Sequence, residues 1–430
     1  MLPLLVKPLE SLYRLERIPI VMSKANQDTV IFSDEDTDGM CACRIIHNAI
    51  SLNAPKATHT IMWQDWDVFG MTDKNVSDIM DLKPATVFIL DLGSGQEMLN
   101  YAVAFLASGI NVIILDNHPP DLLVETAEAY GEYAKTLANL QGKFPFPNLP
   151  FFYYESSTEN CTTGISYAFA KRMGWSVVNM EKWALLGLEG DVATGTKEGG
   201  PLFQELLNKH PSMRGLLASK SLNSSYDWSI LAFYAQLLHN PRRMIFNKAP
   251  PICYEAMKEM EKIPNWLDFY AMVNKEKIEG DLFWEPTVFP TTTPTPKNSN
   301  TKMLLELTVN YRKDKGDVEK RGNYTQLDYP DFGVTIISSK WNMGSALCSK
   351  FTNTNHKTWF VINTIPKYGV HVSGRGGRDS TIHIGKAFRS ANPAIMEGGG
   401  LKPAGSAKTH TNDVEAILDE LVRCVGVSKQ

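Results

Sequence analysis

The chain has 430 residues, with 43 basic and 47 acidic side chains and a formal net charge of −4 at pH 7. Its hydrophobic fraction of 43% excludes wholesale disorder, and its length predicts two or three domains. A mildly acidic chain does not coat nucleic acid indiscriminately, so any nucleic-acid contact must come from a local basic patch.

The sequence predicts neither membrane insertion nor a disulfide framework. The longest nearly apolar stretch, 101–115, is interrupted by polar residues and is shorter than the ~20 residues of a membrane helix. No basic residues precede the apolar N-terminus, so we expect no secretory signal. The six cysteines form no C-x-x-C pair and have no regular spacing, which argues against a zinc ribbon and against a disulfide framework. This pattern suits a protein of the reducing cytoplasm.

The first half of the chain alternates short apolar strands with helical segments. We expect strands at 29–32, 86–90 and 111–115, and helices at 41–52 and 96–108. This alternation predicts an α/β fold with a parallel sheet covered by helices. Ligands bind at the carboxyl ends of the strands in such sheets.

The second half predicts a connecting region followed by a further domain. The strand pattern fades beyond residue 205, where we expect a helix around 257–266, and the segment 286–300 is a linker rich in proline and threonine. Strands are then expected at 303–311, 332–338 and 358–363, and a final helix at 412–425. The predicted parts are residues 1–205, 206–300 and 301–430.

Four carboxylates crowd the segment Ser33-Asp34-Glu35-Asp36-Thr37-Asp38-Gly39, directly after the first predicted strand and before a helix. Unpaired carboxylates at this density repel one another, so they need metal ions or basic partners. The alternative is a solvated acidic turn in which Asp38 caps the helix.

The arrangement of a strand followed by an aspartate recurs. Asp91 follows the second strand, Asp116 follows the third, and Asp191 follows an apolar helical run at 183–188. Parallel strands would bring their aspartates to one edge of the sheet, where hard oxygen ligands suit Mn²⁺ or Mg²⁺ better than zinc or copper. Two such ions ~3.5–4 Å apart stabilise both the attacking and the leaving oxygen of a phosphoryl displacement.

These motifs, in this order, resemble those of the DHH phosphoesterase superfamily, and the first resembles the form of its RecJ-like exonuclease branch. The motifs are Asp34-x-Asp36-x-Asp38-Gly39, Asp91, Asp116-Asn117-His118 and Gly190-Asp191. The C-terminal part is similar to the DHH-associated domain, through Trp341-Asn342-Met343-Gly344, Ser373-Gly374-Arg375 and Gly398-Gly399-Gly400. The resemblance implies a catalytic parallel-sheet DHH domain and a smaller C-terminal α/β domain across a cleft.

The resemblance also implies a site for two Mn²⁺ or Mg²⁺ ions. Its ligands would be Asp34 and Asp36 for the first ion, Asp38, Asn117 and Asp191 for the second, and Asp91 for both. Asn117 stands where the family has a histidine ligand, and its uncharged amide oxygen is a weaker donor, so we expect a weaker second site. His118 would contact the scissile phosphate or assist the leaving group, and Asp116 would orient this loop.

A basic patch near the C-terminus is the expected substrate contact. Residues 371–389 hold four basic side chains and one acidic side chain, a balance of +3. Arg375 and Arg378, separated by two glycines, could approach phosphate oxygens closely, together with the backbone of Gly374, Gly399 and Gly400. The alternative is a glycine-rich surface hairpin with solvated arginines. Leu401 stands where the family's glycine loop usually continues with histidine.

We therefore expect a metal-dependent phosphodiesterase, specifically a RecJ-like 5′ to 3′ exonuclease acting on single-stranded DNA. One alternative is an oligoribonuclease or cyclic-dinucleotide phosphodiesterase that takes a short substrate. Another is a catalytically impaired replication or repair scaffold, for which Asn117 and Leu401 would be signs of decay. The sequence leaves the oligomeric state open.

Overall fold

The computed structural model describes residues 28–66, 68, 70–92, 96–118, 152–156, 160–190, 201–211, 213–214, 230–263, 266, 300–321, 324–377, 380–400 and 404–428. The chain divides into two compact units. Unit 1 comprises Met1–Arg242 and Asn247–Leu305, and unit 2 comprises Arg243–Phe246 and Glu306–Gln430. In the parts described, no helix has both the length and the apolar character needed to cross a membrane.

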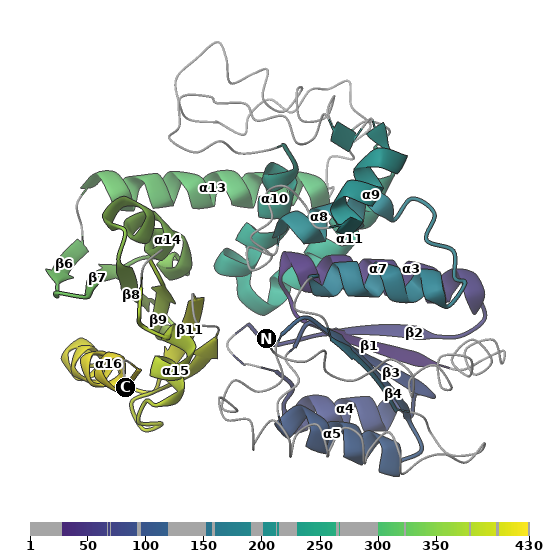
Figure 1. Cartoon of the computed structure of the whole chain (residues 1–430), viewed down its shortest axis with the longest axis horizontal. Coiled ribbons are helices and arrows are strands. Elements are labelled where there is room, and N and C mark those ends of the chain that lie inside the picture. The colour runs from purple at the N-terminus through teal and green to yellow at the C-terminus, as the bar shows by residue number, and fades with distance from the viewer. Residues whose placement is uncertain are drawn as a thin grey trace. The chain divides into compact units, whose positions relative to one another are not determined.

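Unit 1 is built on a five-stranded sheet in which every pairing is parallel (Figure 1). In sheet order the strands are β2 (His59–Trp63), β1 (Thr29–Ser33), β3 (Thr86–Leu90), β4 (Asn111–Asp116) and β5 (Phe152–Ser156). The predicted α/β fold and its three strands in this half are confirmed. Apolar side chains fill the central strands because helices cover both faces of the sheet.

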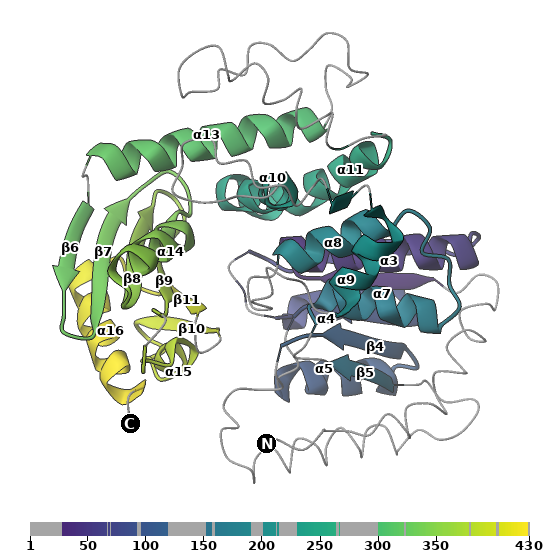
Figure 2. The same cartoon turned by 45° about the horizontal axis from the view of Figure 1, so that its top comes forward.

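Helices cover the two faces of this sheet unequally. Figure 1 shows α4 and α5 on one face and α3 and α7 on the other, and Figure 2 shows α8 and α9 grouped with α3 and α7. The bounds are α3 (Thr37–Asn53), α4 (Asp73–Leu82), α5 (Gln96–Ala107), α7 (Thr162–Arg172), α8 (Glu181–Gly190), α9 (Pro201–Lys209), α10 (Ile230–Ile245), the 3₁₀ turn η3 (Phe246–Lys248) and α11 (Ala249–Glu261).

Alternate strand residues supply the two cores of unit 1. Val30 and Phe32 of β1 join a buried cluster with Ile79 of α4 and other residues of α4 and α5. On the opposite face, Phe88 of β3 packs edge-on against Phe169 of α7, with ring centroids 6.4 Å apart. This alternation is the period of two that a strand imposes on its side chains.

The described segments that lie between the two sheets in the chain are mainly helical, and one predicted strand there is wrong. The predicted helix around 257–266 overlaps α11, while the predicted linker at 286–300 lies outside the described residues except for Asn300. Residues 303–311, expected as a strand, belong to α13 (Asn300–Arg321). Their buried residues Leu304, Leu305, Thr308 and Tyr311 follow helical spacing, which outweighs the β-branched threonine and valine content.

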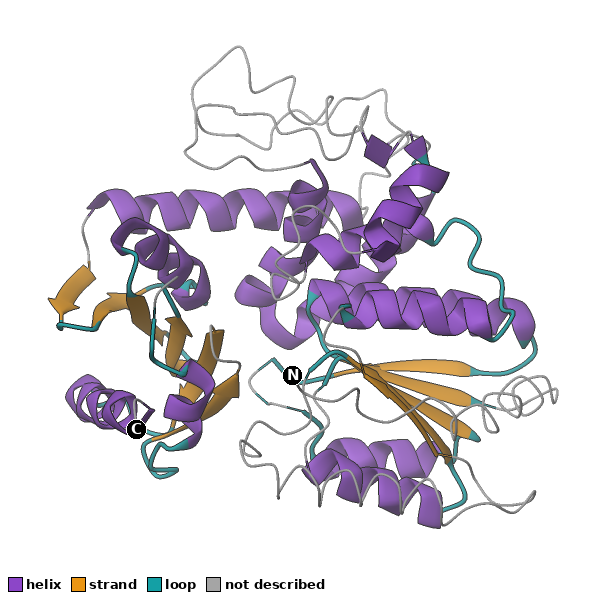
Figure 3. Cartoon of the chain, in the orientation of Figure 1, coloured by secondary structure: helices purple, strands orange, loops and turns teal. Residues whose placement is uncertain are grey.

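Unit 2 contains a six-stranded mixed sheet (Figure 3). In sheet order the strands are β10 (Met396–Gly400), β11 (Ala404–Thr409), β9 (Gly369–Arg375), β8 (Thr358–Ile365), β7 (Phe332–Ser338) and β6 (Tyr324–Asp328). Its helices, besides the end of α13, are α14 (Gly344–Asn355), α15 (Ile384–Arg389) and α16 (Val414–Ser428). The predicted strands at 332–338 and 358–363 and the predicted final helix are confirmed.

Two buried clusters cover the faces of the second sheet. Phe360 of β8 packs with Phe388 of α15 and Leu421 of α16, whereas its neighbour Trp359 packs with Phe351 of α14. Helices therefore lie on both faces of the central strands, as in an α/β domain.

Candidate metal centre

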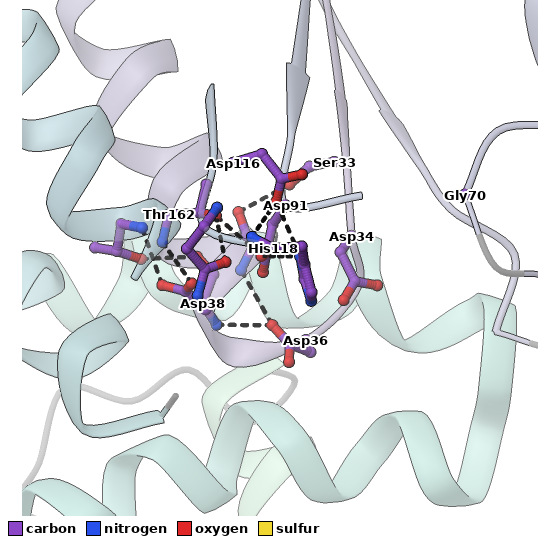
Figure 4. A network of polar contacts seen from close by, with 12 residues as sticks. Ser33, Asp34, Asp36, Asp38, Gly70, Asp91, Asp116, His118 and Thr162 are labelled. Carbon is purple, nitrogen blue, oxygen red and sulfur yellow. Dashed lines mark hydrogen bonds and ion pairs between the residues drawn. The ribbon is translucent and has the colours of Figure 1, made fainter. Parts of the chain in front are cut away.

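Three strands of unit 1 end in an aspartate at the same edge of the sheet (Figure 4). Asp34 directly follows β1, Asp91 directly follows β3, and Asp116 is the last residue of β4. The parallel register pairs Ser33 with Leu90 and Leu90 with Leu115, so the three carboxylates leave the sheet at the same level. The convergence expected from the sequence is present.

These side chains form two groups with metal-ligand geometry. In the first ligand group, Asp34, Asp36 and Asp91 each offer an oxygen within 4.8 Å of the others. In the second ligand group, Asp91, Asp116 and His118 meet the same criterion. Asp91 belongs to both groups, which places it where a carboxylate could serve two ions.

Asp91 holds an unusual backbone conformation at this position. Its φ of 62° lies in the left-handed region, which costs most residues energy but which aspartate adopts more readily. Its N–H still bonds to the carbonyl of Leu115 at 3.2 Å, so the turn begins while pairing with β4 continues. The sequence gives no direct signal for this conformation.

The acidic turn between β1 and α3 is folded around its own backbone. Asp36 caps α3, because its Oδ1 accepts hydrogen bonds from the N–H groups of Asp38 at 2.9 Å and Gly39 at 3.1 Å. A Cβ at Gly39 would lie 2.6 Å from the carbonyl oxygen of Asp34, so only glycine fits there. The capping residue is thus Asp36, not Asp38 as the alternative interpretation supposed.

Asp38 belongs to neither ligand group. Its two carboxylate oxygens accept the N–H groups of Thr162 at 2.8 Å and Thr163 at 3.0 Å, at the start of α7. The Thr163 hydroxyl donates to the Asp38 carbonyl at 2.8 Å. Asp38 therefore caps the N-terminus of α7 from a distant part of the chain, where negative charge is stabilised by the helix dipole.

Thr162 contacts the acidic cluster, although no sequence motif pointed to it. Its hydroxyl lies 3.0 Å from Oδ1 of Asp91 and 3.0 Å from Oδ1 of Asn117, and it accepts the N–H of Asn117 at 3.1 Å. The available signal was a pair of threonines that opens a helix directly after Cys161, whose side chain makes no capping hydrogen bond. Such a pair brings hydroxyls and helix N-terminal N–H groups together, which suits the binding of carboxylates.

His118 is fixed by Asp116. Its Nδ1 lies 2.9 Å from Oδ1 of Asp116 and 3.6 Å from Oδ1 of Asp91. The backbone N–H of His118 also donates to Oδ1 of Asp116, at 3.1 Å. Desolvation alone lowers the pKa of His118, but the charge and hydrogen bond of Asp116 raise it to about 9. With 41% of its side chain exposed, the ring remains accessible to a substrate.

The cluster is electrostatically strained without a cation. Burial raises the pKa of Asp34 to about 7, with a further contribution from the charge of Asp36. Burial also raises the pKa of Asp91 well above its usual value, as do the neighbouring aspartates. Both shifts show that negative charge is disfavoured here, which is the situation that a divalent cation relieves.

The last motif of unit 1 is described only in part. A Cβ at Gly190 would lie 2.7 Å from Cγ2 of Thr37, so the end of α8 packs directly on the first turn of α3. Asp191, the predicted ligand that follows, lies outside the described residues.

In unit 2, the predicted substrate residues gather at one end of the sheet. Arg375 is the last residue of β9, and its Nη2 donates to Oγ of Ser345 in α14 at 2.7 Å. Gly374 packs against Phe360, and a Cβ there would lie 2.8 Å from that ring. The Arg375 side chain is thus positioned by its place on β9 and by its hydrogen bond to α14. Arg378 lies outside the described residues.

The glycine run near the C-terminus is strand and not loop. Gly399 and Gly400 end β10, the edge strand that pairs with β11. A Cβ at Gly398 would lie 2.3 Å from the carbonyl oxygen of Ser406, so close strand pairing requires glycine there. Nothing lies within 4 Å of a Cβ built at Gly399. Leu401 lies outside the described residues.

No protein-family model matches the chain, and no curated protein matches it. Solved structures do. A DHH-domain protein described as a member of a family of ribosomal proteins has a TM-score of 0.61 and 14% identity, over 99% of this chain and 93% of that one. Exonuclease RecJ bound to manganese has a TM-score of 0.57 and 13% identity, over 97% of this chain and 94% of that one.

RecJ from Thermus thermophilus, in complex with Mn²⁺, has a TM-score of 0.59 and 15% identity, over 99% of this chain and 55% of that one. At these identities the likeness concerns the fold. It covers both units, since nearly the whole chain is aligned. The chain therefore has the fold of these DHH-domain and RecJ structures.

Proposed function

We propose that this chain is a metal-dependent phosphoesterase, and specifically a phosphodiesterase that degrades single-stranded DNA from 5′ to 3′. The observation that carries the proposal is the position of Asp91, which belongs to both ligand groups. A carboxylate shared by two ions is the usual way to hold them close enough for phosphoryl displacement. The RecJ-like fold supports the choice of substrate.

The residues present fit divalent ions. The donors are carboxylate oxygens with one imidazole, which Mn²⁺ and Mg²⁺ accept. Oδ2 of Asp116 is buried and has no hydrogen-bond partner, so a ligand atom is available in the second group. Asp34, Asp36 and Asp91 would hold one ion, and Asp91 and Asp116 the other, with the His118 imidazole beside it. Bound ions would supply Lewis-acid stabilisation of charge on the phosphate.

This assignment differs from the sequence expectation for the second ion. We assign Asp38 to the anchoring of α7, because two N–H groups already occupy its oxygens. The Thr162 hydroxyl contacts both Asn117 and Asp91, so Asn117 lies close to the second ligand group. We retain Asn117 as a further oxygen donor. Asp191 also remains a proposed ligand.

The chain's other residues would bind and orient the substrate. His118 combines an exposed ring with a fixed Nδ1, so it can contact a phosphate oxygen or donate a proton to the leaving group. Arg375 would bind a further phosphate through its guanidinium, whose orientation is fixed by Ser345.

The experiment compares hydrolysis of 5′- and 3′-labelled single-stranded DNA, short RNA and cyclic dinucleotides by the purified protein with Mn²⁺. We expect 5′ to 3′ degradation of DNA, and loss of it in Asp91→Asn. The matched control is Asp81→Asn, an exposed carboxylate on α4, which should keep wild-type activity. Activity confined to short RNA or cyclic dinucleotides would replace the DNA substrate, and activity on none would favour a scaffold.

A further inference from the structure

An arginine outside the sequence motifs lies beside the acidic cluster. Nη1 of Arg242, in α10, is 3.6 Å from Oε1 of Glu35, and its side chain is 26% exposed. Its charge also interacts with those of Asp36, Asp34 and Asp91. Arg242 therefore brings a positive charge to the ligand groups from the region that connects the two sheets.

The position of α10 is fixed on both sides of this arginine. The hydroxyl of Thr37, in the first turn of α3, donates to the carbonyl of Ala235 at 3.0 Å. Beyond the helix, the side chain of Asn247 donates to Asp65 at 2.7 Å and accepts the N–H of Trp66 at 2.9 Å. The segment that carries Arg242 is thus bonded on one side to the residues that follow β1 and on the other side to the residues that follow β2.

Glu35 is a buried carboxylate whose ion-pair partner is Arg242. Its side chain is 5% exposed, and its Oε2 is buried without a hydrogen bond. Burial of a carboxylate is costly unless a charge compensates it, and Arg242 is the cation that faces it. The separation of 3.6 Å is longer than a hydrogen bond, so the pair leaves guanidinium donors available to a third group.

We infer that Arg242 binds a substrate phosphate beside the acidic cluster, and that Glu35 is the positioning residue that holds the guanidinium there. The inference rests on the proposed function and names a further part of the same site. A site built from carboxylates repels phosphate, so it needs a cation besides the metals. The planar fork of arginine matches phosphate oxygens, and Asn117 contributes no charge of its own.

The experiment uses Glu35→Gln, Arg242→Gln and the double variant. The matched control is Glu261→Gln, which breaks the ion pair of Glu261 with Arg44 in the same unit, at 2.6 Å. For each protein we would measure KM and kcat on single-stranded DNA with Mn²⁺, Mn²⁺ affinity by calorimetry, melting temperature, and binding of a fluorescent oligothymidylate at several salt concentrations.

Arg242→Gln should raise KM and the oligonucleotide Kd about 10- to 100-fold, because a charge-assisted phosphate contact is lost. The slope of log Kd against log salt should fall by about 0.7, as for one phosphate contact to a single strand. Glu35→Gln should weaken binding about 3- to 10-fold without lowering the melting temperature. The double variant should bind no worse than Arg242→Gln, because the two residues act as one unit.

The inference is overturned if Glu35→Gln behaves like Glu261→Gln, with a lower melting temperature and unchanged KM and Kd. It is also overturned if the effects of Glu35→Gln and Arg242→Gln add in the double variant. Turnover by the wild type decides the proposed function separately. If the wild type hydrolyses no substrate, that function fails, and oligonucleotide binding alone still decides the role of Arg242.

Discussion

Replacement of Thr162 by valine tests whether the hydroxyl between Asp91 and Asn117 organises the metal centre. Thr162 is fully buried, with 0% exposure, so valine keeps the shape and removes only the hydroxyl. The lost contacts are those with the Asp91 carboxylate at 3.0 Å and with the N–H of Asn117 at 3.1 Å. The change also removes the hydroxyl that joins Asp91, at the end of β3, to Asn117, just after β4.

The magnitude follows from these contacts. A hydrogen bond to a charged group contributes about 1.5–3 kcal/mol, and a buried donor that loses its acceptor costs about 1–3 kcal/mol, so we expect a loss of roughly 2–4 kcal/mol. For a unit of this size the melting temperature should fall by roughly 4–8 °C. A ligand carboxylate without its orienting partner should lose about 10- to 100-fold in metal affinity or activity.

The assay combines thermal denaturation with Mn²⁺ titration by calorimetry, so that it does not depend on the substrate. Thr162→Ser should restore most of the Mn²⁺ affinity because it returns the hydroxyl. Leu206→Ala, at a fully buried position of α9, should lose comparable stability and keep the affinity. If Thr162→Val binds Mn²⁺ as the wild type does, or if serine is as poor as valine, the hydroxyl has no organising role.

Three further predictions concern the metal, the substrate and pH. Asn117→His should lower the Mn²⁺ concentration for half-maximal activity, because imidazole is the better donor; a higher requirement would show that Asn117 is itself a fitted contact. Arg375→Ala should raise KM on single strands and leave Mn²⁺ affinity unchanged, whereas unaltered kinetics would mean a solvated surface arginine. Burial raises the pKa of Asp34 to about 7 and that of Glu35 to about 8, so the native state binds more protons than the unfolded state. Metal-free protein should therefore lose stability from about pH 4 to about pH 8, and Mn²⁺ should raise its melting temperature more at about pH 8 than at about pH 4. A melting temperature in EDTA that does not change over this pH range would contradict the prediction.

Much of the site could be predicted from the sequence because it depends on local pattern. A buried strand followed at once by an aspartate is visible in the sequence at Asp34, Asp91 and Asp116. Parallel pairing then brings such residues together whatever the lengths of the intervening segments. The glycine in the acidic turn was equally visible, although its cause, the 2.6 Å approach to the Asp34 carbonyl, was not.

The sequence misled where two local signals competed. Residues 303–311 contain β-branched side chains that favour a strand, yet the spacing of Leu304, Leu305, Thr308 and Tyr311 suits one buried helical face. Burial of that face decided the outcome, since packing outweighs intrinsic preference. The glycines of β10 were similarly assigned to a loop, because pairing with β11 leaves no local trace.

The sequence by itself thus determined which carboxylates reach the sheet edge, since each follows its own strand. Only the tertiary structure decided their partners. Asp38 faces Thr162 across 124 positions of the chain, and Arg242 reaches Glu35 from a helix that carries none of the motifs. Such contacts depend on how α7 and α10 pack against the first strand and helix. That packing results from the burial of many apolar side chains at once, which no short segment of sequence specifies.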